Sequence, residues 1–179
     1  ITLPDGSVRN YESPVTGYQI AESIGPRLLK DAICVEIDNK FQDLSYEISE
    51  NINIRIVTTK DLDALHILRH SSAHILAQAV LNLYPNAQFG VGPSIENGFY
   101  YDFLFETPIK ENELENIEKE MKRIAKSAQS FIRSEITKKD AKKIFKNQKL
   151  KLELIESAES DEGVGEEIVS TYANDEFID

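Results

Sequence analysis

The strongest constraint on the fold is an uninterrupted helical pattern over residues 61–84. Apolar residues recur there mostly at steps of three and four: Leu62, Leu65, Leu68, Leu76, Ala79, Val80 and Leu83. Tyr84-Pro85 closes the pattern, because proline cannot continue a helix. The sequence therefore predicts one long helix in the middle of the chain, starting about four residues after a predicted strand.

The segment before this helix has the order of strands and helix that is typical of a β-grasp. Asp5-Gly6 is a strong turn signal and predicts a hairpin that continues over Val8–Tyr11. A helix opens at Thr16 or Gly17, and Pro26 should end or bend it. Three further strands follow, over Ala32–Ile37, Phe41–Leu44 and Ile52–Val57. Two strands, a helix and three short strands give a ubiquitin-like order.

The segment after the long helix mixes helices and strands. A glycine-rich loop over 89–105 leads into a strand, and the later patterns predict a helix over 114–128, a strand over 131–136, a helix capped by Thr137, and strands over 150–155 and 168–172. The expected fold class is thus α+β. A small β-grasp domain over residues 1–61 precedes a second α+β domain over residues 62–179, which carries the long helix.

Composition excludes several classes of protein. Hydrophobic residues make up 41% of the 179 residues and charged residues 28%, as in a folded globular chain. Its apolar runs fall well short of the roughly 20 residues that span a bilayer, so no membrane partner is expected. One cysteine, Cys34, allows neither an internal disulfide nor a cysteine-rich zinc module. A reducing, cytoplasmic setting is the expectation.

Charge is divided unevenly along the chain. The net charge is −11, yet residues 152–179 hold ten acids and no Lys or Arg, whereas residues 110–151 hold 13 of the 20 basic residues against seven acids. One interpretation is two solvated helix faces followed by an acidic surface loop. The other is a contact with a polyanion at the lysine-rich stretch 138–143.

All three histidines lie on the predicted long helix, at positions 66, 70 and 74. Steps of four place neighbours about 6 Å apart on one stripe, where two imidazoles could hold one zinc ion or one substrate. Polar stripes on helices are common, and no further ligands complete a closed zinc site. The spacing alone leaves these readings open. In the same way, Lys151 reads as a solvent-facing strand residue, and the glycine-rich loop reads either as a turn with core aromatics or as a ligand loop.

Two long motifs resemble a known family. Arg69-His70-Ser71-Ser72-Ala73-His74-Ile75-Leu76 and Gly92-Pro93-Ser94-Ile95-Glu96-Asn97-Gly98-Phe99-Tyr100-Tyr101-Asp102 are similar to the editing domain of bacterial threonyl-tRNA synthetases. The preceding unit, with Leu3-Pro4-Asp5-Gly6-Ser7, resembles that family's TGS domain. The likeness covers the whole chain in the right order.

The resemblance implies a set of site residues. His70 and His74 match the family's first histidine pair, Lys151 its editing lysine, and Asp179 an acidic position beside the scissile ester. Gly92 and Tyr101 match positions that hold the terminal adenosine of the tRNA. His66 lies outside the family motif. The implied reaction is hydrolysis of mischarged Ser-tRNA(Thr), with tRNA(Thr) as the partner.

The resemblance also implies what the chain does not contain. In the family, a Cys-x-x-x-His motif completes the editing site, and its cysteine would stand two positions past Asp179. The aminoacylation domain, with its ATP, magnesium and zinc, and the anticodon-binding domain are absent too, so no cofactor is expected in this fragment. We expect weak editing by the fragment alone. A homodimer is implied for the complete ligase, and a monomer is the expectation for the fragment.

Two alternative functions follow from the same residues. The first is a non-catalytic module that binds tRNA or another RNA, or docks a partner, as TGS units do beside RNA-handling enzymes. The second is a zinc-dependent aminoacyl-ester hydrolase built on His70 and His74. A tRNA-dependent esterase assay separates the first from an editing domain, and metal analysis decides the second.

Overall fold

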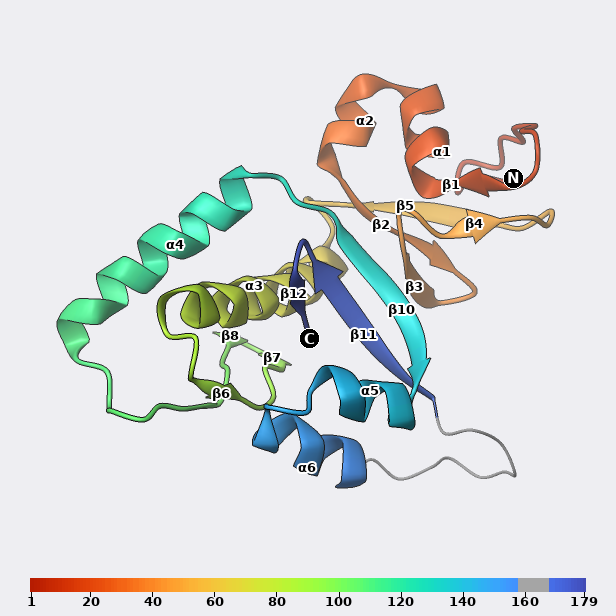
Figure 1. Ribbon diagram of the computed structural model, residues 1–179. Helices are drawn as coiled ribbons and strands as arrows, with labels where there is room; N and C mark the ends of the chain where they lie inside the picture. The colour runs from red at the N-terminus through yellow and green to blue at the C-terminus, as the bar shows by residue number, and fades with distance from the viewer. Residues whose placement is uncertain (158–167) are drawn as a thin grey trace. The chain divides into compact units, whose positions relative to one another are not determined.

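The computed structural model of the chain describes residues 1–157 and 168–179, which form two compact units, Ile1–Leu68 and Arg69–Asp179 (Figure 1). The first unit holds β1 (Val15–Thr16), α1 (Gly17–Ile24), α2 (Pro26–Asp31), β2 (Ala32–Ile37), β3 (Lys40–Asp43), β4 (Glu47–Ile48), β5 (Ile54–Thr58) and the start of α3 (Leu62–Leu83). The second unit holds the rest of α3, then β6 (Gln88–Phe89), β7 (Ser94–Ile95), β8 (Gly98–Phe99), β9 (Phe103–Leu104), η1 (Glu111–Glu113), α4 (Leu114–Lys126), β10 (Phe131–Thr137), α5 (Lys138–Ile144), α6 (Lys149–Ser157), β11 (Ile168–Asn174) and β12 (Phe177–Ile178). This mixture confirms the α+β class.

A three-stranded antiparallel sheet of order β3-β2-β5 is the centre of the first unit, and β1 pairs with β4 beside it. The central strand β2 is apolar on its inner face, where Val35 is fully buried. Helix α1 packs closely on this sheet at Gly17, because a Cβ there would lie 2.6 Å from the side chain of Val35. The hairpin expected after Asp5-Gly6 is reduced to an isolated bridge between Thr2 and Val8.

Local sequence signals explain where α1 and α2 begin. The Thr16 hydroxyl accepts a hydrogen bond from the Gln19 backbone N–H at 3.3 Å, and the Gln19 side chain accepts one from the Thr16 N–H at 2.8 Å. This reciprocal pair is a capping box, and it starts α1. Pro26 begins α2 after α1 has ended at Ile24, because the first position of a helix needs no backbone donor.

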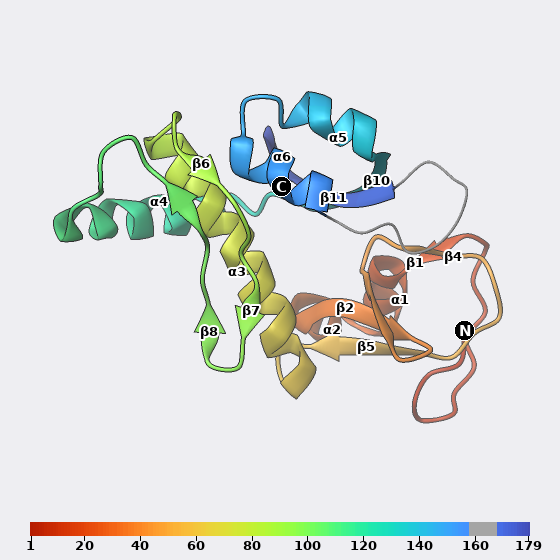
Figure 2. The same ribbon diagram turned by 90° about the horizontal axis from the view of Figure 1, so that it is seen from below.

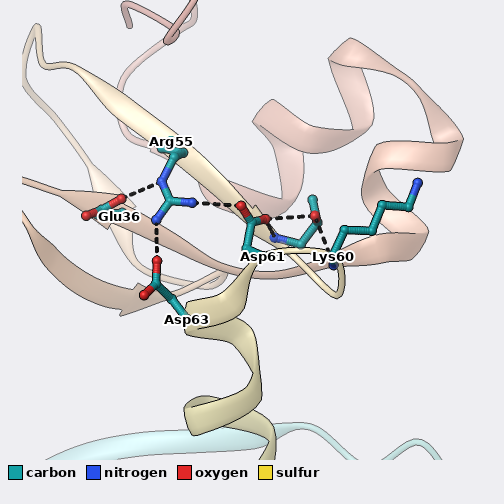
Figure 3. A network of polar contacts seen from close by, with 6 residues as sticks. Glu36, Arg55, Lys60, Asp61 and Asp63 are labelled. Atoms are coloured by element: carbon teal, nitrogen blue, oxygen red, sulfur yellow. Dashed lines mark hydrogen bonds and ion pairs between the residues drawn. The ribbon is translucent and has the colours of Figure 1, made fainter.

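Arg55 on β5 joins the sheet of the first unit to the start of α3 (Figure 3). Its guanidinium donates to Glu36 on β2 at 2.5 Å, and to Asp61 and Asp63 at 2.9 Å each. Asp61 in turn accepts from the backbone N–H of Thr58 at 2.7 Å. Five donors in one planar fork allow a single arginine to bind three carboxylates. The first turn of α3 is therefore fixed to the strand that precedes it.

In the second unit, α3 packs against a three-stranded antiparallel sheet of order β10-β11-β12. Figure 1 shows β10 and β11 running side by side, and their register pairs Phe131 with Asn174 and Thr137 with Ile168. Helix α4 covers another side of α3, where Ile117 and Ile124 are buried against it. These elements agree with the sequence predictions, and Thr137 caps α5 as expected by accepting from the Asp140 N–H at 3.1 Å.

The strand predicted over 150–155 is wrong, because this segment is helix α6. The Leu152 N–H donates to the Gln148 carbonyl at 3.0 Å, and Ile155 is buried in the core with Phe89 and Phe145. A short apolar run fits either period, so alternation over six residues does not decide between strand and helix. The acidic loop expected before Ile168 falls largely outside the described residues.

Candidate active site

The predicted site begins with two histidines one turn apart on α3. The Nε2 atoms of His70 and His74 lie 3.2 Å apart, and the two rings meet edge to face with centroids 4.6 Å apart. His74 is 9% exposed, whereas His70 lies at the surface. The four-residue step puts both rings on one stripe, and the stripe runs from solvent into the interior.

Asp179 is the hub of the buried part of the site. Its Oδ2 is 2.6 Å from His74 Nδ1 and accepts a hydrogen bond from the Tyr101 hydroxyl at 2.7 Å. Its Oδ1 accepts from the ammonium group of Lys151. One carboxylate, 5% exposed, therefore joins side chains from α3, from the glycine-rich loop and from α6.

The surroundings of Asp179 keep it ionised. Burial by itself would raise the pKa of this carboxyl, but the hydrogen bond to His74 and the positive charge of Lys151 outweigh it and hold the pKa at about 2. An ionised carboxylate only accepts hydrogen bonds, so His74 must donate through Nδ1–H. The Nε2 of a neutral His74 is then an acceptor directed at His70.

Tyr101 is held at its ring and at its hydroxyl. The ring stacks on Phe103 with centroids 5.0 Å apart. Burial raises the pKa of Tyr101 far above its usual value, and the negative charge of Asp179 adds to the effect, so the hydroxyl remains a donor. Gly92 lies against this ring, because a Cβ there would be 2.1 Å from Tyr101 Cδ2. Glycine at 92 is therefore required by the position of Tyr101.

A hairpin over residues 90–102 carries Gly92 and Tyr101. The Gly90 N–H donates to the Asp102 carbonyl at 2.8 Å, and the Asp102 N–H donates to the Val91 carbonyl at 3.0 Å. At its tip, β7 pairs with β8 (Figure 2), and the Arg69 guanidinium binds the carbonyl of Glu96 at 2.6 Å. The glycine-rich loop is thus a paired hairpin that is anchored to α3 beside the histidines.

Lys151 reaches the site from α6. Its side chain is 14% exposed, and its Nζ lies 5.0 Å from the ring centroid of Phe89 and 5.8 Å from that of Tyr101. A cation between two aromatic rings and a carboxylate is held in one place. Lys151 is neither solvent-facing nor on a strand, so the interpretation of it as a solvent-facing strand residue is wrong.

The structure therefore brings together all six residues that the family resemblance selected: His70, His74, Lys151, Asp179, Gly92 and Tyr101. His66, which lies outside the family motif, is exposed. Sequence reasoning missed the aromatic walls around His74, formed by Phe131 at 6.1 Å and Tyr172 at 5.6 Å between centroids. It also did not single out Gln78, which is buried on α3 one turn beyond His74.

Among residues 1–157 and 168–179, no group of three or more His, Cys, Asp or Glu side chains is arranged to hold a metal ion. A surface hollow of about 590 Å³ beside Tyr84, Phe105 and Lys110 includes none of the six site residues. Within the same described ranges, no helix is long and apolar enough to cross a bilayer.

These features define a class of protein. Residues 1–58 match the family model of the TGS domain, which agrees with the β-grasp order of the first unit. The chain is therefore a TGS-domain protein, in which an α+β unit with paired histidines on its long helix follows the TGS domain.

Comparison with characterised proteins gives the particular family. The chain is 45% identical over 181 residues to the threonine–tRNA ligase of Francisella philomiragia, 46% identical over 180 residues to that of Streptococcus sanguinis, and 40% identical over 179 residues to that of Desulfosudis oleivorans. Each match includes the whole of this chain. The chain spans about 28% of the length of these ligases. It is homologous to the N-terminal region of threonine–tRNA ligases.

Proposed function

We propose that the second unit is the part of a threonine–tRNA ligase that hydrolyses mischarged Ser-tRNA(Thr). The observation that supports this proposal most directly is that His74 lies between the ionised Asp179 and His70 and contacts both. Similarity over the full chain to threonine–tRNA ligases supports this assignment. The domain division over residues 1–61 and 62–179 belongs to the same proposal, with the first domain as a TGS module and the second as an editing domain that continues into a Cys-x-x-x-His motif.

The need for such a reaction follows from the size of the substrates. Serine differs from threonine by the loss of one methyl group, and a methyl group changes binding by only about 1–3 kcal/mol. A synthetic site that accepts threonine therefore also accepts some serine. A second site that admits serine and excludes the extra methyl corrects the error by hydrolysis of the ester.

In this mechanism the two histidines hold the ester end and the attacking water. Asp179 accepts from the Nδ1–H of His74, so the Nε2 of a neutral His74 is a hydrogen-bond acceptor next to His70. In the substrate complex, that lone pair can hold a water or the ribose hydroxyl. His70 lies at the solvent-exposed end of the pair, where the ester end of the tRNA would enter.

Lys151 and Tyr101 complete the electrostatics. The Lys151 ammonium group, fixed by Asp179, would orient the water or stabilise negative charge that develops on the ester oxygen. Tyr101 and Gly92 would hold the terminal adenosine, with the Tyr101 ring kept in place by Phe103 and its hydroxyl by Asp179. ATP, magnesium and zinc would act in other parts of the complete ligase.

Helix α5 is the proposed contact with tRNA phosphates. Lys139 and Lys142 are exposed on this helix. Lys142 is paired with Glu156 at 3.1 Å, however, and Lys143 with Asp140 at 2.7 Å. These acids reduce the local positive charge. The contact would therefore be weak and would fall steeply as salt is raised.

The binding half of the proposal is tested with a stable analogue of the tRNA end. The ligand is 3′-amino-3′-deoxyadenosine with serine joined to its 3′-nitrogen as an amide, and it is titrated into ¹⁵N-labelled chain. The corresponding threonine amide is the matched ligand. We expect tighter binding of the serine compound, with shifts centred on His70, Gly92 and Tyr101. His66→Ala is the control variant, because His66 lies on the same helix but outside the site. Binding of neither compound, or equal binding of both, contradicts the proposal.

The hydrolytic half is tested with purified Ser-tRNA(Thr) and Thr-tRNA(Thr). We expect slow release of serine without release of threonine, loss of this activity in His74→Ala, and normal activity in His66→Ala. Release of both amino acids at one rate, or serine release that His74→Ala leaves unchanged, would refute the assignment of these residues. No release of serine despite selective binding of the serine amide would refute catalysis by this chain and leave only a binding module.

A further inference from the structure

A buried amide pair lies one helical turn beyond His74. Gln78 on α3 and Asn174 at the end of β11 are 6% and 2% exposed. The Asn174 Nδ2 donates to Gln78 Oε1 at 2.6 Å, and Gln78 Nε2 donates back to the Asn174 backbone carbonyl at 3.2 Å. The two residues are 96 positions apart in the sequence. Such a reciprocal, buried contact between a helix and a strand fixes both elements closely.

Gln78 alone orients the amide of Asn174 among the described residues. The Oδ1 of Asn174 is buried and has no hydrogen-bond partner in that part of the chain. Gln78 also donates to Gln129 at 3.3 Å, so its own orientation has a second support. Removing the Gln78 amide would therefore release the Asn174 side chain, whereas Gln78 would keep its bonds to Gln129 and to the Asn174 backbone carbonyl if the Asn174 side chain were removed.

Asn174 ends the strand of the hairpin that delivers Asp179. Strand β11 turns at Asp175 and returns as β12, with Asn174 opposite Phe177. Two residues before Asn174, Tyr172 exchanges both backbone hydrogen bonds with Asp179, at 2.7 and 2.9 Å. Tyr172 and Asn174 point to the same face of β11, because side chains alternate along a strand. The Tyr172 ring lies 5.6 Å from that of His74, which identifies this face as the one packed on α3.

The helix and the hairpin have matching repeats along this face. Four residues of helix, from His74 to Gln78, advance about 6 Å. Two residues of strand, from Tyr172 to Asn174, advance roughly 6.6 Å. Two contacts therefore connect the same two elements at nearly equal spacing. One is His74 with Asp179, opposite Tyr172, and the other is Gln78 with Asn174.

We propose that the Gln78–Asn174 pair is a register lock that places Asp179 on the Nδ1 of His74. Gln78 and Asn174 are positioning residues, since neither would touch the substrate. Without the lock, the hairpin could shift along α3, and a displacement of about 1 Å at a catalytic group can lower a rate by about 100-fold. The effect on hydrolysis rests on the proposed function, but the effect on His74 does not.

The test uses variants that change the lengths of the two amides. Gln78→Asn and Asn174→Gln each alter one side chain by one methylene, and the double variant restores the total length. Asn82→Ala is the matched control, because Asn82 lies one further turn along α3 and contacts Glu120 on α4 instead. Far-UV circular dichroism and thermal unfolding confirm that each variant is folded.

The first readout is the tautomer of His74, measured by long-range ¹H–¹⁵N correlation on ¹⁵N-histidine-labelled chain near pH 8. We expect the Nδ1–H form in the parent chain and in Asn82→Ala. Each single variant should lose that form in part, and the double variant should recover it. Single variants with the parent's tautomer and shifts would overturn the proposal. Loss of the fold in all three amide variants would overturn it too, because the pair would then be a requirement of the core.

The second readout is the release of serine from Ser-tRNA(Thr). We expect about 10- to 100-fold slower release in the single variants and recovery in the double variant. Inactivity of the parent chain would count against the proposed hydrolysis, while the tautomer measurement would still decide the register lock. Unchanged tautomers with slowed hydrolysis would overturn the lock and leave the proposed function intact.

Discussion

Replacement of Asp179 by Asn isolates the carboxylate on which the site depends. The pKa of Asp179 is about 2, compared with 3.8 for a free aspartate. A difference of this size stabilises the folded protein by about 2 kcal/mol at pH 7. Asparagine removes that contribution and leaves the Lys151 ammonium, 14% exposed, without its carboxylate. We expect the free energy of unfolding to fall by about 2–4 kcal/mol at pH 7.

The pH dependence gives this prediction its sign. A depressed pKa contributes stability that is complete above the unfolded value and disappears as the pH falls toward 2. The difference between the parent chain and Asp179→Asn should therefore shrink by about 1 kcal/mol between pH 7 and pH 3. Comparing the two chains cancels the contributions of carboxyl groups that the substitution leaves unchanged.

Urea unfolding, followed by far-UV circular dichroism at several pH values, measures this difference. Glu176→Gln is the matched control, because Glu176 is an exposed carboxylate at the turn of the same hairpin. The control should stay within about 0.5 kcal/mol of the parent chain throughout. A stability loss in Asp179→Asn that is the same at pH 7 and pH 3 would refute the ionised, buried carboxylate as its cause.

Three further predictions use other parts of the chain. Gly92→Ala should displace the Tyr101 ring and abolish binding of the serine amide, as measured by titration of the analogue. Gly98→Ala is the control and should bind normally, because no atom lies within 4 Å of the added Cβ. Arg55→Ala breaks three partly exposed ion pairs, so it should lower the free energy of unfolding by about 1–3 kcal/mol, with a smaller loss at high salt. An unchanged urea midpoint would refute the contribution of these ion pairs. Burial raises the pKa of the Cys34 thiol to about 11, so a disulfide reagent at pH 8 should modify it only after urea is added, and fast reaction of the folded chain would contradict this.

Most elements of the fold could be predicted from local sequence signals. The long helix was predicted from its apolar period and its closing Tyr84-Pro85, and α3 ends at Leu83 as expected. The capping residues Thr16 and Thr137 mark helix starts in both sequence and structure. These signals are local because a cap or a proline acts on the backbone within one turn. The prediction of a strand over 150–155 is wrong because this short apolar run has no such marker to distinguish a helix from a strand.

The candidate site divides in the same way. That His70 and His74 share a stripe could be predicted from the sequence, since four-residue spacing on a helix leaves no other arrangement. Only the packed structure shows that Asp179, 105 residues after His74, accepts a hydrogen bond from His74 Nδ1–H, and that Lys151 and Tyr101 bind the same carboxylate. No local rule connects α3, α6 and the β11–β12 hairpin. Their contacts depend on how an apolar core packs, and packing is a property of the whole unit.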